Sequence, residues 1–153
     1  EMIGTVTLDA ITYADPPHRF EAGTPPIIEA IGLGAAIDWL STLDRGAVLA
    51  HEHALYERAV SQLEGANWLK IIGDAPGKAA ILAFTMDGAH AHDVAQVLDW
   101  YGVAVRAGTH CAEPLMRRFG CGSSARASFA LYNTPEDADA LVQALFKARS
   151  FFA

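Results

Sequence analysis

The chain has 153 residues, enough for one domain with a real hydrophobic core and too few for two large ones. A net charge of -7 and three scattered lysines argue against a nucleic-acid surface, which would need a basic stripe. No apolar stretch is long enough to span a bilayer, and no basic segment followed by an apolar one opens the sequence. We therefore expect a cytoplasmic protein whose two cysteines stay reduced.

The first part of the chain predicts a strand, an ordered loop and a helix. The alternating run "TVTLD" (5–9) is typical of a strand, and the four prolines in 14–26 indicate a loop. Thr24 followed by Pro25 predicts the start of a helix, with the threonine hydroxyl as its N-cap. We expect this helix to run to about residue 43.

Two glycines interrupt this predicted helix. Gly32 and Gly34 each cost roughly 1 kcal/mol relative to alanine inside a helix. Such a cost predicts that another backbone approaches closely there. A second helix is expected over 47–64, with Gly65 as its C-cap. Its predicted inward residues are Leu49, Leu55, Ala59, Val60 and Leu63.

The rest of the chain is predicted to alternate strands and helices. "GDAPGK", between two β-rich runs, is a turn signal and predicts a hairpin. Thr134 as N-cap, followed by Pro135 and two acids, predicts the start of the last helix. In chain order we expect a hairpin over 67–86, a helix over 87–102 with Val94, Val97, Leu98 and Tyr101 on one face, a strand over 103–108, a short helix over 111–120, a strand over 123–133 and a helix over 134–152.

This order predicts an α+β fold in which a mostly antiparallel sheet is covered by helices. The sequence has no repeats, no low-complexity tract and no internal linker. The pattern by itself therefore predicts one domain.

The stretch "RAGTHCAEPL" (106–115) holds the strongest candidate for chemistry. Cys111 follows a predicted strand and a glycine, so it lies where loops carry function. Arg106, His110 and the start of a helix are all close in sequence, and each would favour the thiolate. A buried cysteine that acts as a small hydrophobe is an equally good reading of this pattern.

The other candidates carry weaker signals. Cys121, in a glycine-rich turn, lacks a partner at metal or redox spacing and is predicted to be structural. The six histidines include no HExxH pair, so we expect no metal site. Arg106 and Arg126 lie on predicted strands among small apolar residues and are each suited to hold a carboxylate. A structural salt bridge is the alternative for either arginine.

Gly23 and Thr24, ahead of a helix, offer a hydroxyl and free backbone N–H groups as an anion site. A plain helix cap is the alternative. No Walker A, GxGxxG or GxSxG motif is present. The residues alone thus indicate thiol chemistry on a small anionic substrate, without naming the reaction.

Three stretches together resemble the C-terminal third of a SufS-type (group II) cysteine desulfurase: "HRFEAGTPPIIEAIGLGAAIDWL", "VRAGTHCAEPL" and "RASFALYNTPEDADAL". These are fold-type I enzymes of the class V aminotransferase group, which depend on pyridoxal 5'-phosphate. The resemblance covers essentially the whole chain, and the RxGxHCAxPL motif is its most specific part. It implies that 1–45 are the end of the large cofactor domain with a connecting helix, and 46–153 the small C-terminal α+β domain.

The resemblance also implies roles for individual residues. Cys111 aligns with the nucleophile that takes sulfur from L-cysteine, leaving L-alanine and a persulfide. Arg126 matches the arginine that holds the substrate α-carboxylate, and Arg106 matches a motif arginine beside the active site. Thr24, next to Gly23, matches the residue that reaches the cofactor phosphate of the partner subunit in the family's homodimer. The implied acceptor of the persulfide is a SufE- or SufU-like protein that serves iron–sulfur cluster assembly.

One departure from the family is expected to matter. The family's cofactor lysine lies in a histidine–lysine motif, and none of Lys70, Lys78 and Lys147 has that context. We therefore expect the chain to be a fragment that does not turn over cysteine by itself. Two alternatives stay open: a selenocysteine lyase, and a cofactor-free persulfide carrier or interaction module.

Overall fold

The computed structural model describes residues 2–73 and 75–153 and divides the chain into two compact units, Glu1–Leu43 and Asp44–Ala153. Each unit is described by itself. No helix in the described part of the chain combines the length and the apolar character needed to cross a bilayer.

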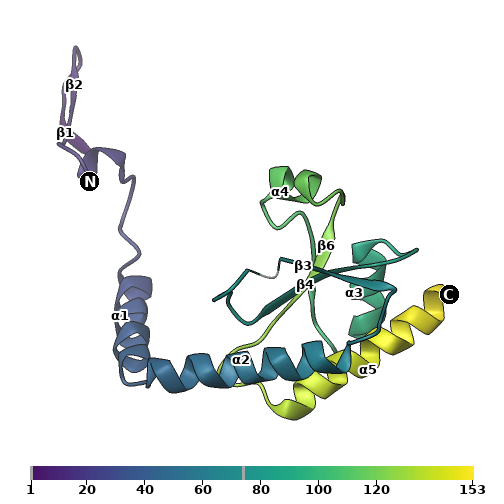
Figure 1. Cartoon of the computed structure of the whole chain (residues 1–153). Helices are drawn as coiled ribbons and strands as arrows, with labels where there is room; N and C mark the ends of the chain where they lie inside the picture. The colour runs from purple at the N-terminus through teal and green to yellow at the C-terminus, as the bar shows by residue number, and fades with distance from the viewer. Residues whose placement is uncertain (1, 74) are drawn as a thin grey trace. The chain divides into compact units, whose positions relative to one another are not determined.

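The first unit is small and holds a hairpin and a helix (Figure 1). Strand β1 (Ile3–Val6) pairs antiparallel with β2 (Ile11–Tyr13), and a short 3-10 helix η1 covers His18–Phe20. Helix α1 spans Ile27–Ser41. The predicted strand is thus present and begins two residues earlier than its pattern; β2 and η1 were not predicted, because neither has a regular hydrophobic period.

One prediction about α1 is wrong, and a second is not seen in the described residues. Thr24 is not its N-cap: Pro26 holds that position, and no side chain caps the first turn. The run of two prolines delays the helix, because each residue before a proline is disfavoured from the α conformation. At Gly32 and Gly34 an added Cβ would meet no atom within 4 Å among the described residues, so no close backbone approach is seen there.

The second unit is an α+β sandwich. Its sheet has the order β3-β4-β6-β5, and every neighbouring pair is antiparallel. The predicted fold class is confirmed. The elements are α2 (Arg45–Gln62), β3 (Leu69–Ile72), β4 (Ile81–Met86), α3 (Ala91–Trp100), β5 (Arg106–Gly108), α4 (Glu113–Arg118), β6 (Ser124–Ser128) and α5 (Pro135–Phe152).

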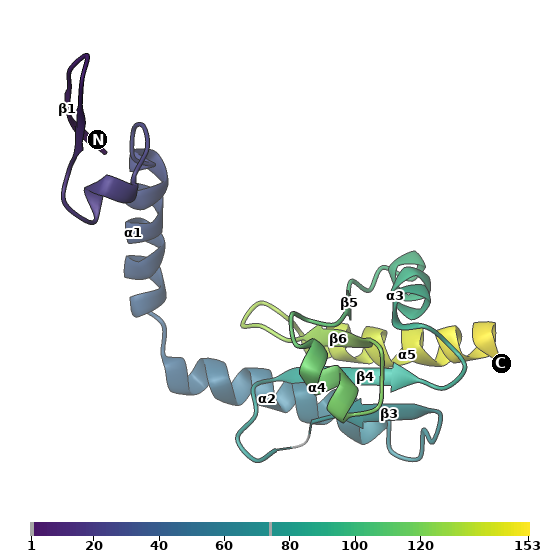
Figure 2. The same ribbon diagram turned by 90° about the horizontal axis from the view of Figure 1, so that it is seen from above.

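One face of this sheet carries the hydrophobic core. Along β4 every second residue is buried, as expected for a strand with one face covered. Helices α2, α3 and α5 pack on that face, while the short helix α4 lies on the opposite side of the sheet (Figures 1 and 2). The core includes Leu55, Ala59, Leu82, Phe84, Met86, Val94, Val97, Leu98, Leu141 and Leu145.

Most predicted inward positions are confirmed, and two are wrong. Leu49 is 65% exposed, because it lies near the start of α2, before the part of that helix whose residues Leu55 and Ala59 enter the core. Tyr101 is 49% exposed, and the Lys147 ammonium lies 4.5 Å from the centre of its ring. Gly65 has positive φ but is not the C-cap of α2, which is Leu63; it lies two residues further on.

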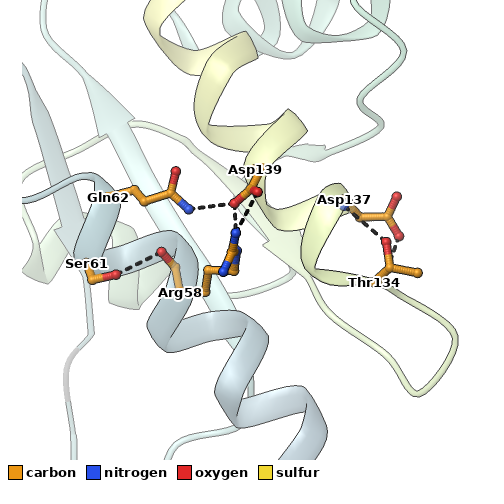
Figure 3. Close-up of polar contacts among 6 residues, drawn as sticks. All are labelled: Arg58, Ser61, Gln62, Thr134, Asp137 and Asp139. Carbon is orange, nitrogen blue, oxygen red and sulfur yellow. Dashed lines mark hydrogen bonds and ion pairs between the residues drawn. The ribbon is translucent and has the colours of Figure 1, made fainter.

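Polar contacts at the start of α5 fix this helix against α2 (Figure 3). The Thr134 hydroxyl accepts from the Asp137 N–H, and the Asp137 carboxylate accepts from the Thr134 N–H, which completes a capping box. Asp139 accepts two hydrogen bonds from Arg58, at 2.7 and 2.8 Å, and one from Gln62. These donors lower the pKa of Asp139 to about 2.

Candidate functional site

The register of β5 and β6 brings two arginines together. Arg106, the first residue of β5, is directly paired with Arg126 in the middle of β6, although twenty residues separate them in sequence. Directly opposed residues of an antiparallel pair project from the same side of the sheet. The paired row continues to Ala83 on β4, and it alternates with the row of Ala125 and Phe84 that enters the core. Both arginines therefore lie on the sheet face that α2, α3 and α5 leave uncovered.

Immediately after β5 the chain forms a tight, strained turn. His110 and Cys111 have φ of 56° and 59°, and they are the non-glycine residues with positive φ in the described chain. Each such residue costs roughly 1–2 kcal/mol, because its Cβ crowds the following carbonyl. Residues held in such backbone conformations occur more often at functional sites than elsewhere. The turn leaves Cys111 exposed, ahead of α4.

The Cys111 thiol lies beside one of the two arginines. Its Sγ is 3.9 Å from a terminal guanidinium nitrogen of Arg106. The reading of Cys111 as a buried filler is therefore wrong: the side chain is accessible and has a cationic neighbour.

His110 is held by a buried residue rather than turned toward the thiol. Its Nε2 is 3.0 Å from both the carbonyl oxygen and the hydroxyl of Ser124, which is fully buried on β6. Burial lowers the pKa of His110; the Ser124 carbonyl opposes this, and the charges of Arg126 and Arg106 add to the lowering. The ring is thus neutral at pH 7, so the expectation that His110 supplies positive charge to Cys111 is not supported.

Arg126 has unused capacity to bind an anion. Its Nε is buried and has no hydrogen-bond partner among the described residues. A buried donor without a partner costs about 1–3 kcal/mol, and directly opposed like charges on neighbouring strands are destabilising as well. A carboxylate that accepts from Arg126 would remove both costs, and the guanidinium fork suits it. The structural salt bridge considered from the sequence is not seen: no carboxylate in the described residues pairs with Arg126 or Arg106.

The surroundings of the site are basic within an acidic chain. Residues 106–126 contain four arginines and a single carboxylate, that of Glu113, which pairs with Arg117 at 2.8 Å. The whole chain has a net charge of -7. The exposed thiol therefore lies in the segment of the chain that most favours an anionic substrate.

Cys121 follows α4 in the sequence, and its side chain is half-buried. Its Sγ lies 3.7 Å from the Met116 carbonyl oxygen, and its N–H donates to the same oxygen at 3.1 Å. It also lines a cavity of about 220 Å³ with His90 and Ser123, whose side chains are 3.2 Å apart. These contacts agree with the structural role expected from the sequence.

The residues predicted to hold the cofactor belong to the other unit. Gly23 has φ of 78° and Thr24 is exposed, both within Glu1–Leu43. Their geometry is not that of a helix start, since α1 begins three residues later. Cys111, Arg106 and Arg126 are brought together in the second unit.

The three lysines of the chain have surroundings that differ from one another. Lys78 donates to the Gly73 carbonyl at 2.7 Å, Lys147 lies over Tyr101, and Lys70 is exposed on β3. In the described residues, the contacts of Lys78 and Lys147 therefore lie outside the cluster of Cys111, Arg106 and Arg126.

Two residues that complete the site were not identified from the sequence. Ser124 anchors His110, and its hydroxyl lies 3.6 Å from the Met116 sulfur on α4, so it joins β6 to the helix that follows the thiol. Local spacing gave no sign of either contact, because they span 14 and 8 residues. The sequence signal that could have indicated Ser124 was the presence of a serine within a β-rich run.

A family model described as Aminotransferase class-V matches residues 1–141. The chain therefore belongs to the class-V aminotransferase family, as its resemblance to cysteine desulfurases implied. Among curated relatives, a probable cysteine desulfurase from Streptomyces coelicolor is 52% identical over 99% of this chain and 37% of its own length. One from Halobacterium salinarum is 46% identical over 100% of this chain and 37% of its own length.

Solved structures give the same result. The cysteine desulfurase CsdA of Escherichia coli, crystallised in an S-sulfonic acid form, superposes with a TM-score of 0.85 at 36% identity. The match covers 99% of this chain and 38% of the CsdA chain. A cysteine desulfurase from Thermococcus onnurineus matches with a TM-score of 0.78 at 35% identity, over 99% of this chain and 37% of its own. The chain thus spans well under half the length of the relatives it matches.

Proposed function

We propose that this chain is the C-terminal part of a pyridoxal-phosphate-dependent cysteine desulfurase of the SufS type, in which Cys111 takes sulfur from L-cysteine. The observation that carries the proposal is the geometry of Cys111: an exposed thiol in a left-handed turn, 3.9 Å from Arg106. Its neighbour Arg126, paired with Arg106, has a buried donor left for an anion.

In this proposal Arg126 binds the α-carboxylate of the substrate. Its fork offers two parallel N–H donors, which fixes the orientation of the carboxylate as well as its position. Arg106 lies between the carboxylate site and the thiol and keeps the sulfur in a cationic environment. The neutral ring of His110 adds no third charge.

The sulfur transfer balances without an added oxidant. The Cys111 thiolate bonds to the substrate sulfur, and the bond between that sulfur and its Cβ breaks. The electron pair remains on the product carbon, which takes a proton and becomes the methyl group of L-alanine. Cys111 is left as a persulfide. When bound, pyridoxal phosphate supplies the electron sink that makes this carbon able to carry the pair.

The remaining parts of the proposal follow the family resemblance. The unit Glu1–Leu43 would be the end of the large domain, and Gly23 and Thr24 would contact the cofactor phosphate of the partner subunit in a homodimer. The persulfide would pass in the cytoplasm to a SufE- or SufU-like acceptor for iron–sulfur cluster assembly. We propose that the chain alone does not turn over cysteine.

A second function is favoured by one specific observation. The site contains an exposed thiol and no lysine, since Lys78 and Lys147 are engaged elsewhere. A chain with these groups alone would still accept a persulfide on Cys111 from a donor protein, as a cofactor-free carrier. Preference for selenocysteine over cysteine is a further variant of the leading proposal.

The test uses a chimera that joins this chain to the preceding part of the Streptomyces coelicolor relative. With pyridoxal phosphate and L-cysteine, the chimera is expected to release sulfide and L-alanine in equal amounts when a reductant is present. Cys111→Ala is expected to abolish both, and Cys121→Ala to retain them as the matched control. L-selenocysteine in the same assay measures the substrate preference. Full activity of the Cys111→Ala chimera would refute the assignment of the nucleophile.

The carrier function is tested on the 153-residue chain. Trypsin places Cys111 in the peptide 107–117 and Cys121 in 119–126, so mass spectrometry follows each thiol separately. A gain of one sulfur atom on 107–117 from a persulfidated donor protein, without turnover by the chimera, favours the carrier. A borohydride-reducible cofactor adduct on one of the three lysines would overturn the statement that the chain alone lacks the attachment site.

A further inference from the structure

The His110 side chain connects the thiol-bearing turn to strand β6. The last register pair of β5 and β6 joins Gly108 to Ser124, and the turn follows directly. Within the turn, the Ala112 N–H donates to the Thr109 carbonyl at 2.9 Å. This bond closes the turn but does not attach it to β6. The His110 side chain supplies that attachment, through its two 3.0 Å contacts with Ser124.

The chemistry of these contacts fixes the hydrogen positions. A carbonyl oxygen only accepts, so the proton of the His110 ring is on Nε2 and is shared between the Ser124 carbonyl and hydroxyl oxygens. The Ser124 hydroxyl is then free to donate toward the Met116 sulfur, 3.6 Å away. His110, Ser124 and Met116 therefore form a directed chain of hydrogen bonds. It runs from the turn through β6 to the buried face of α4.

Water can reach this chain of hydrogen bonds only at the end where the turn lies. Ser124 is fully buried and Met116 is 4% exposed, whereas Cys111 is exposed. Without the His110 donor, the Ser124 carbonyl would lose its contact with the turn, and nothing else in the described residues holds the turn from that side. The backbone of Cys111 would then relax from φ of 59° toward the ordinary region, and Sγ would leave Arg106.

We propose that His110 is a positioning residue: its imidazole, hydrogen-bonded to Ser124, holds Cys111 in the left-handed conformation that places the sulfur beside Arg106. The inference rests on the proposed function of Cys111 as the reactive thiol. It goes beyond that function in assigning the strain of the turn to a single hydrogen-bonded ring, which touches neither substrate nor thiol.

The test compares two substitutions of nearly equal size in the 153-residue protein. His110→Gln keeps an N–H donor at about the position of Nε2, whereas His110→Leu fills similar space without a donor. The first readout is the intraresidue amide–Hα NOE of Cys111, which is strong at positive φ because the two hydrogens are then closest. We expect a strong NOE in wild type and His110→Gln, and its loss in His110→Leu. His53→Ala, an exposed histidine of α2, is the matched control.

The second readout is alkylation of Cys111 by iodoacetate, followed on the peptide 107–117 with Cys121 as the internal reference. In wild type, Arg106→Ala is expected to slow this alkylation, because the guanidinium beside Sγ attracts the carboxylate of the reagent. In the His110→Leu background the same Arg106 substitution is expected to have no further effect. The equilibrium constant for the left-handed conformation of Cys111 should fall about fivefold, the factor that corresponds to one net hydrogen bond of about 1 kcal/mol.

A strong Cys111 NOE in His110→Leu, with the Arg106 effect intact, overturns the proposal. So does global unfolding of His110→Leu while His110→Gln folds, since His110 would then support the fold rather than the thiol. If the NOE and the coupling behave as expected but the chimera forms no persulfide, the proposed function fails and the positioning role stands.

Discussion

Replacing Arg126 by methionine is expected to stabilise the protein while removing the proposed anion site. The change removes a buried donor that has no partner among the described residues, and it relieves the like-charge pairing with Arg106. An unsatisfied buried donor costs about 1–3 kcal/mol. Methionine keeps most of the aliphatic volume, so little packing is lost.

The magnitude can be followed by thermal and urea unfolding. For a chain of this size, a stability change of about 1 kcal/mol shifts the midpoint by about 2–4 °C, so Arg126→Met should raise it by roughly 2–12 °C. The gain should be larger at low ionic strength, because salt screens the repulsion that the substitution removes. Arg118→Met, at an exposed position of α4, is the matched control and should change the midpoint little.

The anion site supplies the complementary measurement. A carboxylate that binds the folded protein raises its stability by RT ln(1 + [L]/Kd). Added L-alanine should therefore stabilise wild type and Arg118→Met, and leave Arg126→Met unchanged. An Arg126→Met protein that is less stable than wild type, at both high and low salt, would refute the reasoning that this arginine is strained in the absence of an anion.

Three further substitutions and one titration test other parts of the structure. Leu98→Ala should lower the free energy of unfolding by about 2–5 kcal/mol in urea, because the side chain is fully buried. Thr134→Ala should cost about 1 kcal/mol in the same assay through loss of the capping box. Asp139→Asn should lower the free energy of unfolding at pH 7, where the Asp139 carboxylate is charged and bonded to Arg58. The difference in stability between wild type and Asp139→Asn should vanish as the pH falls from about 4 toward 2, since the pKa of Asp139 in the folded protein is about 2. In an NMR titration, the pKa of the His110 ring should lie below its ordinary value of 6.5. Acidification through pH 6.5 should therefore destabilise wild type more than His110→Gln, because the unfolded chain then binds a proton that the folded ring does not. A ring that titrates at or above pH 6.5 would contradict the burial of His110.

The elements with local signals were predictable from the sequence. Thr134 and Pro135 define the start of α5, and a turn at Pro76 and Gly77 lies between β3 and β4, because capping and turn formation involve residues only a few positions apart. The α+β class followed from the order of these elements. Thr24 failed as a cap because two prolines after it compete with the helix, and Leu49 failed because periodicity indicates a face but not where a neighbouring helix covers it.

The sequence by itself singled out Cys111, Arg106 and Arg126 as residues suited to thiol and carboxylate chemistry, and their motif indicated the family. Only the tertiary structure decided that these residues meet, because the strand register that pairs Arg106 with Arg126 is a contact across twenty residues. It also decided the role of His110. Proximity in sequence suggested a charge beside the thiol, whereas burial and the bond to Ser124 make the ring a neutral anchor. Side-chain direction and burial depend on the packed sheet, and no spacing along the chain contains them.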